Sequence, residues 1–135
     1  MDESFKQRGE TILVVDDTDI TLNLVASILK TANFTVLGAS NGPAALELAA
    51  TYSERIDLLL SDVQMPGMSG PDLGKTLKRS RPDMHVMLMS GLPGGEPLAL
   101  NYGWAFIQKP FVPSKLLEMV NVVLHTLDKS QCSHQ

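Results

Sequence analysis

The sequence predicts an α/β fold, a doubly wound five-stranded parallel sheet covered on both faces by five helices. Short apolar runs alternate with helix-like segments along the chain, which is the pattern of strands joined by helical crossovers. The runs are nearly all apolar, as expected of strands buried on both faces. Right-handed crossovers bring the carboxyl ends of parallel strands to one edge, so we expect a functional site there.

The composition indicates one globular domain with no nucleic-acid-binding or membrane-inserted segment. Its 135 residues suffice for a buried core, and 44% of them are hydrophobic. A net charge of −4 without a basic run argues against nucleic-acid binding. No apolar run approaches the roughly 18 residues that cross a membrane, and the N-terminus is polar, so we expect a cytoplasmic domain. A single cysteine, Cys132, excludes an intrachain disulfide.

The first half of the chain predicts three strands and two helices. The strands are expected at residues 11–15, 35–39 and 56–61. The first helix, residues 20–31 with Asp19 as its N-cap, is apolar on several sides and is expected to be largely buried. Asn41 and Gly42 end the second strand, and Pro43 opens a second helix that extends to about residue 51.

The second half predicts two more strands and three helices. A Pro/Gly turn at residues 66–70 precedes a helix at 71–79 and a strand at 84–89. The Gly/Pro-rich segment 91–97 leaves room only for a short helix at 98–102. A strand at 104–108 and an amphipathic helix at 113–128 complete the pattern. We expect a domain at residues 10–128 between flexible tails at 1–9 and 129–135.

Polar side chains close four of the predicted strands. Asp16 and Asp17 follow the first strand, Asp62 the third, Ser90 the fourth and Lys109 the fifth. A lone acidic residue there is usually a turn former, but three converging carboxylates repel each other. The repulsion is roughly 1 kcal/mol per pair at 4 Å in water and about 4 at an effective dielectric of 20. Such a cluster requires a cation, and all-oxygen ligation suits Mg²⁺ better than zinc.

These residues belong to motifs that are typical of one family. The motifs are Val14-Val15-Asp16-Asp17, Ser61-Asp62 with Met65-Pro66-Gly67-Met68-Ser69-Gly70, Met89-Ser90-Gly91, and Lys109-Pro110-Phe111. From Thr11 to Leu127, the chain resembles the receiver domain of bacterial two-component response regulators. The resemblance implies the flavodoxin-like receiver fold with strand order 2-1-3-4-5.

The resemblance also implies the chemistry of the site. Asp62 would be the phosphoacceptor, taking a phosphoryl group from a phosphohistidine. Asp17 and Asp62 would bind Mg²⁺ directly, Asp16 partly through water, and the backbone carbonyl of Gln64 would be a further ligand. Lys109 would contact the phosphoryl oxygens.

Two residues are expected to report the phosphoryl group. In the family, the residue at Ser90 moves toward the phosphate and an aromatic at the position of Phe106 swings inward. These motions would alter the face formed by the fourth helix, fifth strand and fifth helix. The Lys109-Pro110 bond matches one that is cis in the family. Leu92 stands where polar side chains of relatives can position the hydrolytic water, so we predict no polar help from it.

The expected partner is a sensor histidine kinase or a phosphotransfer protein, and the Gly/Pro segment resembles receivers attached to hybrid sensor kinases. We expect a monomer or weak dimer without stand-alone enzymatic turnover. Two alternatives remain open. One is a receiver-like binding module that is not phosphorylated. The other is a haloacid-dehalogenase-like phosphatase that uses Asp17, because Asp17-Thr18-Asp19-Ile20-Thr21 fits its first motif; the acidic motif that should follow Lys109 is missing.

Overall fold

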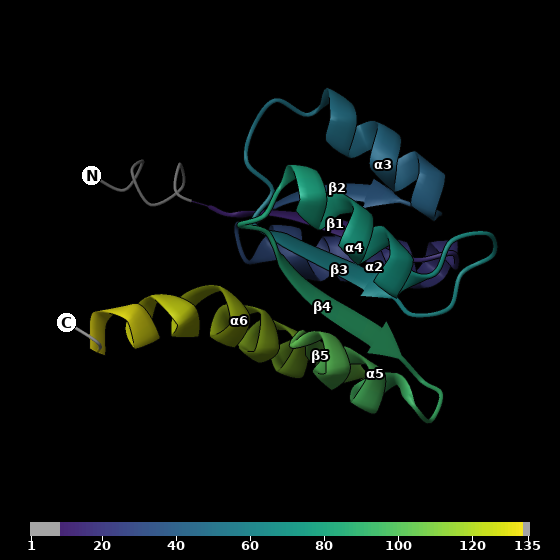
Figure 1. The fold of residues 1–135 in the computed structure, drawn as a ribbon. Helices are drawn as coiled ribbons and strands as arrows, with labels where there is room; N and C mark the ends of the chain where they lie inside the picture. The colour runs from purple at the N-terminus through teal and green to yellow at the C-terminus, as the bar shows by residue number, and fades with distance from the viewer. Residues whose placement is uncertain (1–8, 134–135) are drawn as a thin grey trace.

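The computed structural model describes residues 9–133, which form one parallel sheet with helices on both faces (Figure 1). The strands are β1 (Thr11–Val15), β2 (Thr35–Ala39), β3 (Leu58–Asp62), β4 (His85–Ser90) and β5 (Ala105–Gln108). The helices are α2 (Asp19–Thr31), α3 (Gly42–Thr51), α4 (Gly70–Ser80), α5 (Gly95–Tyr102) and α6 (Pro113–Ser133). The strand order is β2-β1-β3-β4-β5, so the predicted fold class is confirmed.

Two layers of apolar side chains hold the sheet. Successive strand residues face opposite sides, so Leu59 packs toward α3, α4 and α5, whereas Leu58 and Leu60 pack toward α2 and α6. In Figure 1, α4 lies in front of the sheet and α2 behind it. The strands β1, β3 and β4 are buried almost throughout, as predicted, and they form the rigid part from which the site projects.

The edge of the sheet near β2 is more open than the sequence suggests. β2 is partly exposed, because it is an edge strand with a neighbour on one side only. The prediction that α2 is largely buried is also wrong. Only Val25 and Leu29 are buried on it, whereas Ile20 is 79% and Leu24 is 54% exposed. One side of α2 covers the sheet, where Leu22 and Ile28 also pack against the core, whereas Ile20 and Leu24 face outward.

The helix starts differ from the predictions at two places. Thr18, not Asp19, occupies the N-cap position of α2; its backbone is extended, and its N–H donates to Asp16 Oδ1 at 2.9 Å. Helix α5 begins at Gly95, ahead of the predicted residue 98. The glycines lie at its cap and first turn, and Pro97 falls in that turn as well, where an amide lacks a helical acceptor anyway.

The predicted N-terminal tail lies almost entirely outside the described residues, whereas most of the predicted C-terminal tail is helical. Residues 1–8 and 134–135 are outside them, and α6 continues past the predicted end at residue 128 to Ser133. The flexibility of both ends remains a prediction. Between residues 9 and 133, no helix combines the length and apolar character needed to span a membrane.

Candidate functional site

Three carboxylates meet at the carboxyl edge of the sheet. The strands β1 and β3 are parallel neighbours in which Val15 pairs with Ser61, so the residues that follow, Asp16 and Asp62, come side by side. One carboxylate oxygen from each of Asp16, Asp17 and Asp62 lies within 4.8 Å of the other two. Asp16 is fully buried, Asp62 is partly buried and Asp17 is exposed, so the cluster opens to solvent on one side.

Lys109 places a positive charge among these carboxylates. It follows β5, and its Nζ lies 2.8 Å from Asp16 Oδ2 and 3.5 Å from Asp62 Oδ2. Its backbone N–H donates to the Ser90 carbonyl at 2.9 Å, which ties it to the end of β4. The Lys109–Pro110 bond is cis, as the resemblance implies. One ammonium against three carboxylates leaves the cluster with surplus negative charge.

The pKa of Asp62 reflects its burial first and this surplus second. Burial raises the pKa of Asp62 from its ordinary 3.8 to about 6; Lys109 lowers it, and the charges of Asp16 and Asp17 raise it further. A nearby cation stabilises the charged form of a carboxyl group whose pKa is raised in this way. Oxygen donors with one side open to water and phosphate fit Mg²⁺, which keeps several water ligands.

Ser90 is the last residue of β4, on the strand next to β3. It follows Met89, which pairs with Asp62 in the sheet register, so it adjoins the phosphoacceptor candidate. Its side chain is 5% exposed, and its Oγ accepts a hydrogen bond from the Leu92 N–H at 3.0 Å. Because a hydroxyl both accepts and donates, this bond leaves the Ser90 proton for a further acceptor.

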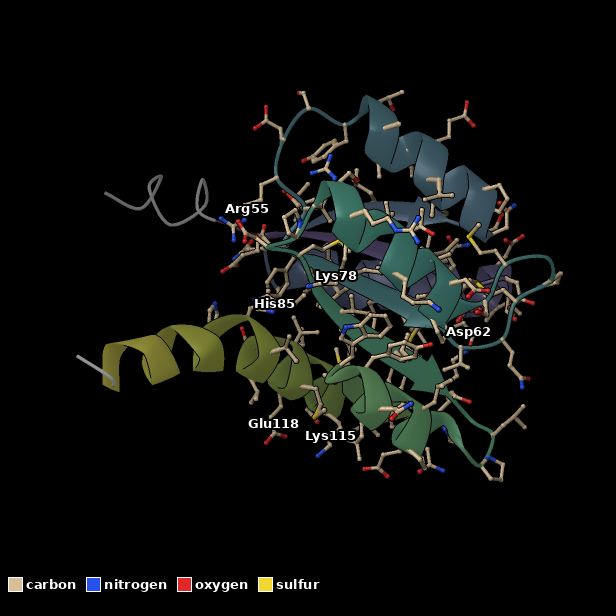
Figure 2. The ribbon with its side chains drawn as sticks, viewed as in Figure 1. Arg55, Asp62, Lys78, His85, Lys115 and Glu118 are labelled. Carbon is tan, nitrogen blue, oxygen red and sulfur yellow. The ribbon has the colours of Figure 1, made fainter. Side chains whose placement is uncertain are left out.

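Two predicted site residues lie further out. Gln64 is an exposed residue in the loop between β3 and α4, and its role as a carbonyl ligand remains a prediction. Phe106 lies in β5 opposite Leu88 and packs against the core between the sheet and α5. Its predicted inward motion is likewise untested. Figure 2 shows Asp62 at one end of the sheet and Arg55 and His85 toward the other.

Two features of the site were not foreseen from the sequence. One is the close ion pair between Lys109 and buried Asp16. These residues belong to the last and the first of the four sequence motifs, and only the fold brings them together. Gly70 packs directly on β3, because a Cβ there would overlap the carbonyl oxygen of Asp62. The sequence feature that could have predicted this contact is the glycine directly after the Ser69 cap. A residue without a side chain lets α4 begin against the Asp62 backbone.

Comparison with known proteins assigns the family. The model of the response regulator receiver domain matches residues 12–121, so the chain belongs to this family. It is 31% identical over 121 residues to the chemotaxis protein CheY of Thermotoga maritima, covering 85% of this chain and 98% of that protein. A CheY-like receiver structure from Methanospirillum hungatei has a TM-score of 0.78 and 30% identity, covering 90% and 98% of the two chains.

Longer signalling proteins also contain a similar segment. The sensor kinase CckA of Brucella abortus is 31% identical over 121 residues, which are 87% of this chain and 13% of that kinase. The chain spans only 13–21% of the first four curated relatives. The activities of those whole proteins are therefore not carried over to this chain.

Proposed function

We propose that this receiver domain accepts a phosphoryl group onto Asp62 from the phosphohistidine of a sensor histidine kinase or phosphotransfer protein. The observation that carries the proposal is the convergence of Asp16, Asp17 and Asp62 within 4.8 Å, with Lys109 Nζ 3.5 Å from Asp62. Membership of the receiver family supports the kind of partner.

In the proposed reaction, a carboxylate oxygen of Asp62 attacks the phosphorus atom. The phosphorus–nitrogen bond breaks, the imidazole nitrogen keeps the electron pair, and an acyl phosphate forms. Lys109 pairs with the phosphoryl oxygens, and the Ser90 hydroxyl donates to them. Asp17, Asp62, the Gln64 carbonyl and, through water, Asp16 would hold Mg²⁺. When bound, Mg²⁺ supplies neutralising charge to the transferring group.

The proposed output is the face formed by α5, β5 and α6. A surface cavity of about 590 Å³ lies on this face, and Phe106 is part of its lining together with Glu96 and Lys115. A ring that changes position on phosphorylation would therefore change the shape of this surface. This geometry supports the predicted switch through Ser90 and Phe106.

The exposed side of α2 supports a protein partner. Ile20 and Leu24 are largely exposed, and the helix starts directly after Asp17 and Thr18. Large apolar side chains beside a charged site favour association with another protein.

We infer the setting from the relatives. A cytoplasmic location, a monomer or weak dimer and attachment to a hybrid sensor kinase are consistent with the similarity to CckA. The domain would take part in its own phosphorylation and dephosphorylation without turning over another substrate.

Labelling with a radioactive acyl phosphate donor and Mg²⁺ tests the proposal. Asp62→Asn should abolish labelling, because it removes the nucleophile. Asp17→Asn should weaken labelling through loss of Mg²⁺, and Asp83→Asn, an exposed acid at the opposite end of β4, should leave it unchanged. Labelling that persists in Asp62→Asn and vanishes in Asp17→Asn would instead indicate the phosphatase-like alternative. A wild-type protein that takes no label would indicate the binding module.

A further inference from the structure

Gly95 is the point at which α5 touches both proposed switch residues. It is buried at the first position of the helix. A Cβ at this position would lie 2.7 Å from Phe106 Cε1 and 2.9 Å from Ser90 Cβ, closer than real Cβ atoms approach their neighbours. Only glycine therefore allows the start of α5 to rest on both side chains at once.

The start of α5 depends on this contact more than on a cap. Gly94 is the N-cap residue, with φ of +96°, and makes no side-chain capping bond. A helix of eight residues without a side-chain cap gains little stability by itself. Its position is therefore set by tertiary packing, to which the Gly95 contact contributes.

A natural fluorescent probe, Trp104, lies just beyond the C-terminal end of α5. Trp104, the single tryptophan of the chain, stacks on Tyr102, the last residue of α5, with ring centroids 4.5 Å apart. The backbone N–H of Trp104 donates to the Ala99 carbonyl at 2.9 Å. Its ring also meets α4, since a Cβ on Gly74 would lie 2.8 Å from the indole. A displacement of α5 must therefore change the surroundings of this indole.

We propose that Gly95 is a positioning residue that makes α5 move with Ser90 and Phe106. The inference rests on the proposed phosphorylation of Asp62. Close-packed contacts change between discrete arrangements rather than yielding gradually. A shift of Ser90 toward a phosphoryl group would alter the surface on which Gly95 rests, and α5 would follow. A side chain at position 95 would hold the helix away from both residues.

The test compares Gly95→Ala with Gly38→Ala. The control also exchanges a glycine for alanine, but a Cβ on Gly38 lies at an ordinary 3.6 Å from Leu22. Both variants are treated with Mg²⁺ and a small acyl phosphate donor, while Asp62 labelling and Trp104 fluorescence are recorded. We expect all proteins to be labelled and the fluorescence change to be lost in Gly95→Ala alone.

The outcomes separate the two proposals. A labelled Gly95→Ala protein with the wild-type fluorescence change would overturn the role of Gly95, as would equal loss in Gly38→Ala. Absence of label on wild-type Asp62 would overturn the proposed function itself, and this inference with it. Hydrogen exchange in the wild-type protein needs no variant. Phosphorylation should alter exchange of the α5 amides, and unchanged exchange there would contradict the inference.

Discussion

The charged side chains at the two ends of the sheet differ in how completely they are paired. At the amino end, Arg55 Nε lies 2.9 Å from Asp57 Oδ1, and His125 Nε2 lies 3.0 Å from Glu10 Oε2. Arg81 donates to three backbone carbonyls, those of Ala49, Tyr52 and Glu54, at 2.8–3.0 Å. At the carboxyl end, three carboxylates share one ammonium.

This difference indicates that the paired side chains at the amino end contribute to stability, whereas the carboxylates at the carboxyl end form the candidate functional site. The side chains named at the amino end have partners within the chain, so they serve mainly to join β1, β3 and the helix ends. The carboxyl end leaves negative charge uncompensated, at a cost in stability that an external cation would offset. Residues at the two ends should therefore respond differently to substitution, to pH and to Mg²⁺.

Arg81→Ala should have the largest effect on stability. It removes a guanidinium that caps the end of α3 and the following loop, and bonds to charged donors contribute about 1.5–3 kcal/mol each. Since Arg81 is partly exposed, we expect the free energy of unfolding to fall by about 3 kcal/mol in urea titrations. Asp62 labelling of the folded protein should be unchanged. Arg79→Ala, an exposed neighbour, is the control; equal losses in both would refute the capping role.

Asp62→Asn should act in the opposite sense and stabilise the protein. The pKa of Asp62 is about 6 in the fold and 3.8 ordinarily, so the native state binds this proton more tightly than the unfolded state. Wild-type stability should therefore fall as pH rises from about 4 to about 6, by about 1–2 kcal/mol after solvent screening. The variant should lack this decrease. Urea titrations across this range that show parallel curves for both proteins would contradict the assignment.

Mg²⁺ should stabilise the wild-type protein by a comparable amount. At a concentration about ten times its dissociation constant, a ligand specific to the native state adds about 1.4 kcal/mol. Thermal unfolding with Mg²⁺, and again after a chelator is added, measures this gain. Asp17→Asn should show little of it, whereas Asp83→Asn should keep it. A gain of equal size in Asp17→Asn would place the ion elsewhere.

Leu92→Glu should have the smallest effect on stability, because the side chain is 53% exposed. It provides a carboxylate that can help to position the hydrolytic water, so phospho-Asp62 should decay faster than in the wild type. The half-life of the label after removal of the donor measures this. An unchanged half-life would count against any role for position 92 in dephosphorylation.

The fold was predictable because the strands lie in separate apolar runs. Most strand and helix limits differ by a residue or two, which is ordinary fraying, whereas α6 extends five residues past its predicted end at residue 128. The error at the start of α5 came from treating Gly94, Gly95 and Pro97 as helix breakers. In the structure they lie at the cap and in the first turn, where such residues are tolerated. The exposure of Ile20 was missed because an apolar pattern does not show which side a neighbour covers.

The members of the candidate site were predictable, but not their contacts. Because Asp16, Asp17 and Asp62 lie at the carboxyl ends of parallel strands, the sequence predicted that they share one edge of the sheet. The structure brings them together there. The pairing of Lys109 with Asp16 depends on how far the lysine reaches across the sheet edge. The contacts of Gly70 and Gly95 depend on the distance of a helix from a strand. Neither the reach of the lysine nor the distance between a helix and a strand can be read from residue type or spacing.

We propose that the uncompensated carboxylates make Asp62 the phosphoacceptor. Peptide mass spectrometry of the wild-type protein, after treatment with Mg²⁺ and an acyl phosphate donor, locates the phosphate. We predict a single Mg²⁺-dependent phosphate on Asp62. Phosphate on Asp17, or its absence from the peptide that contains Asp62, would contradict the claim.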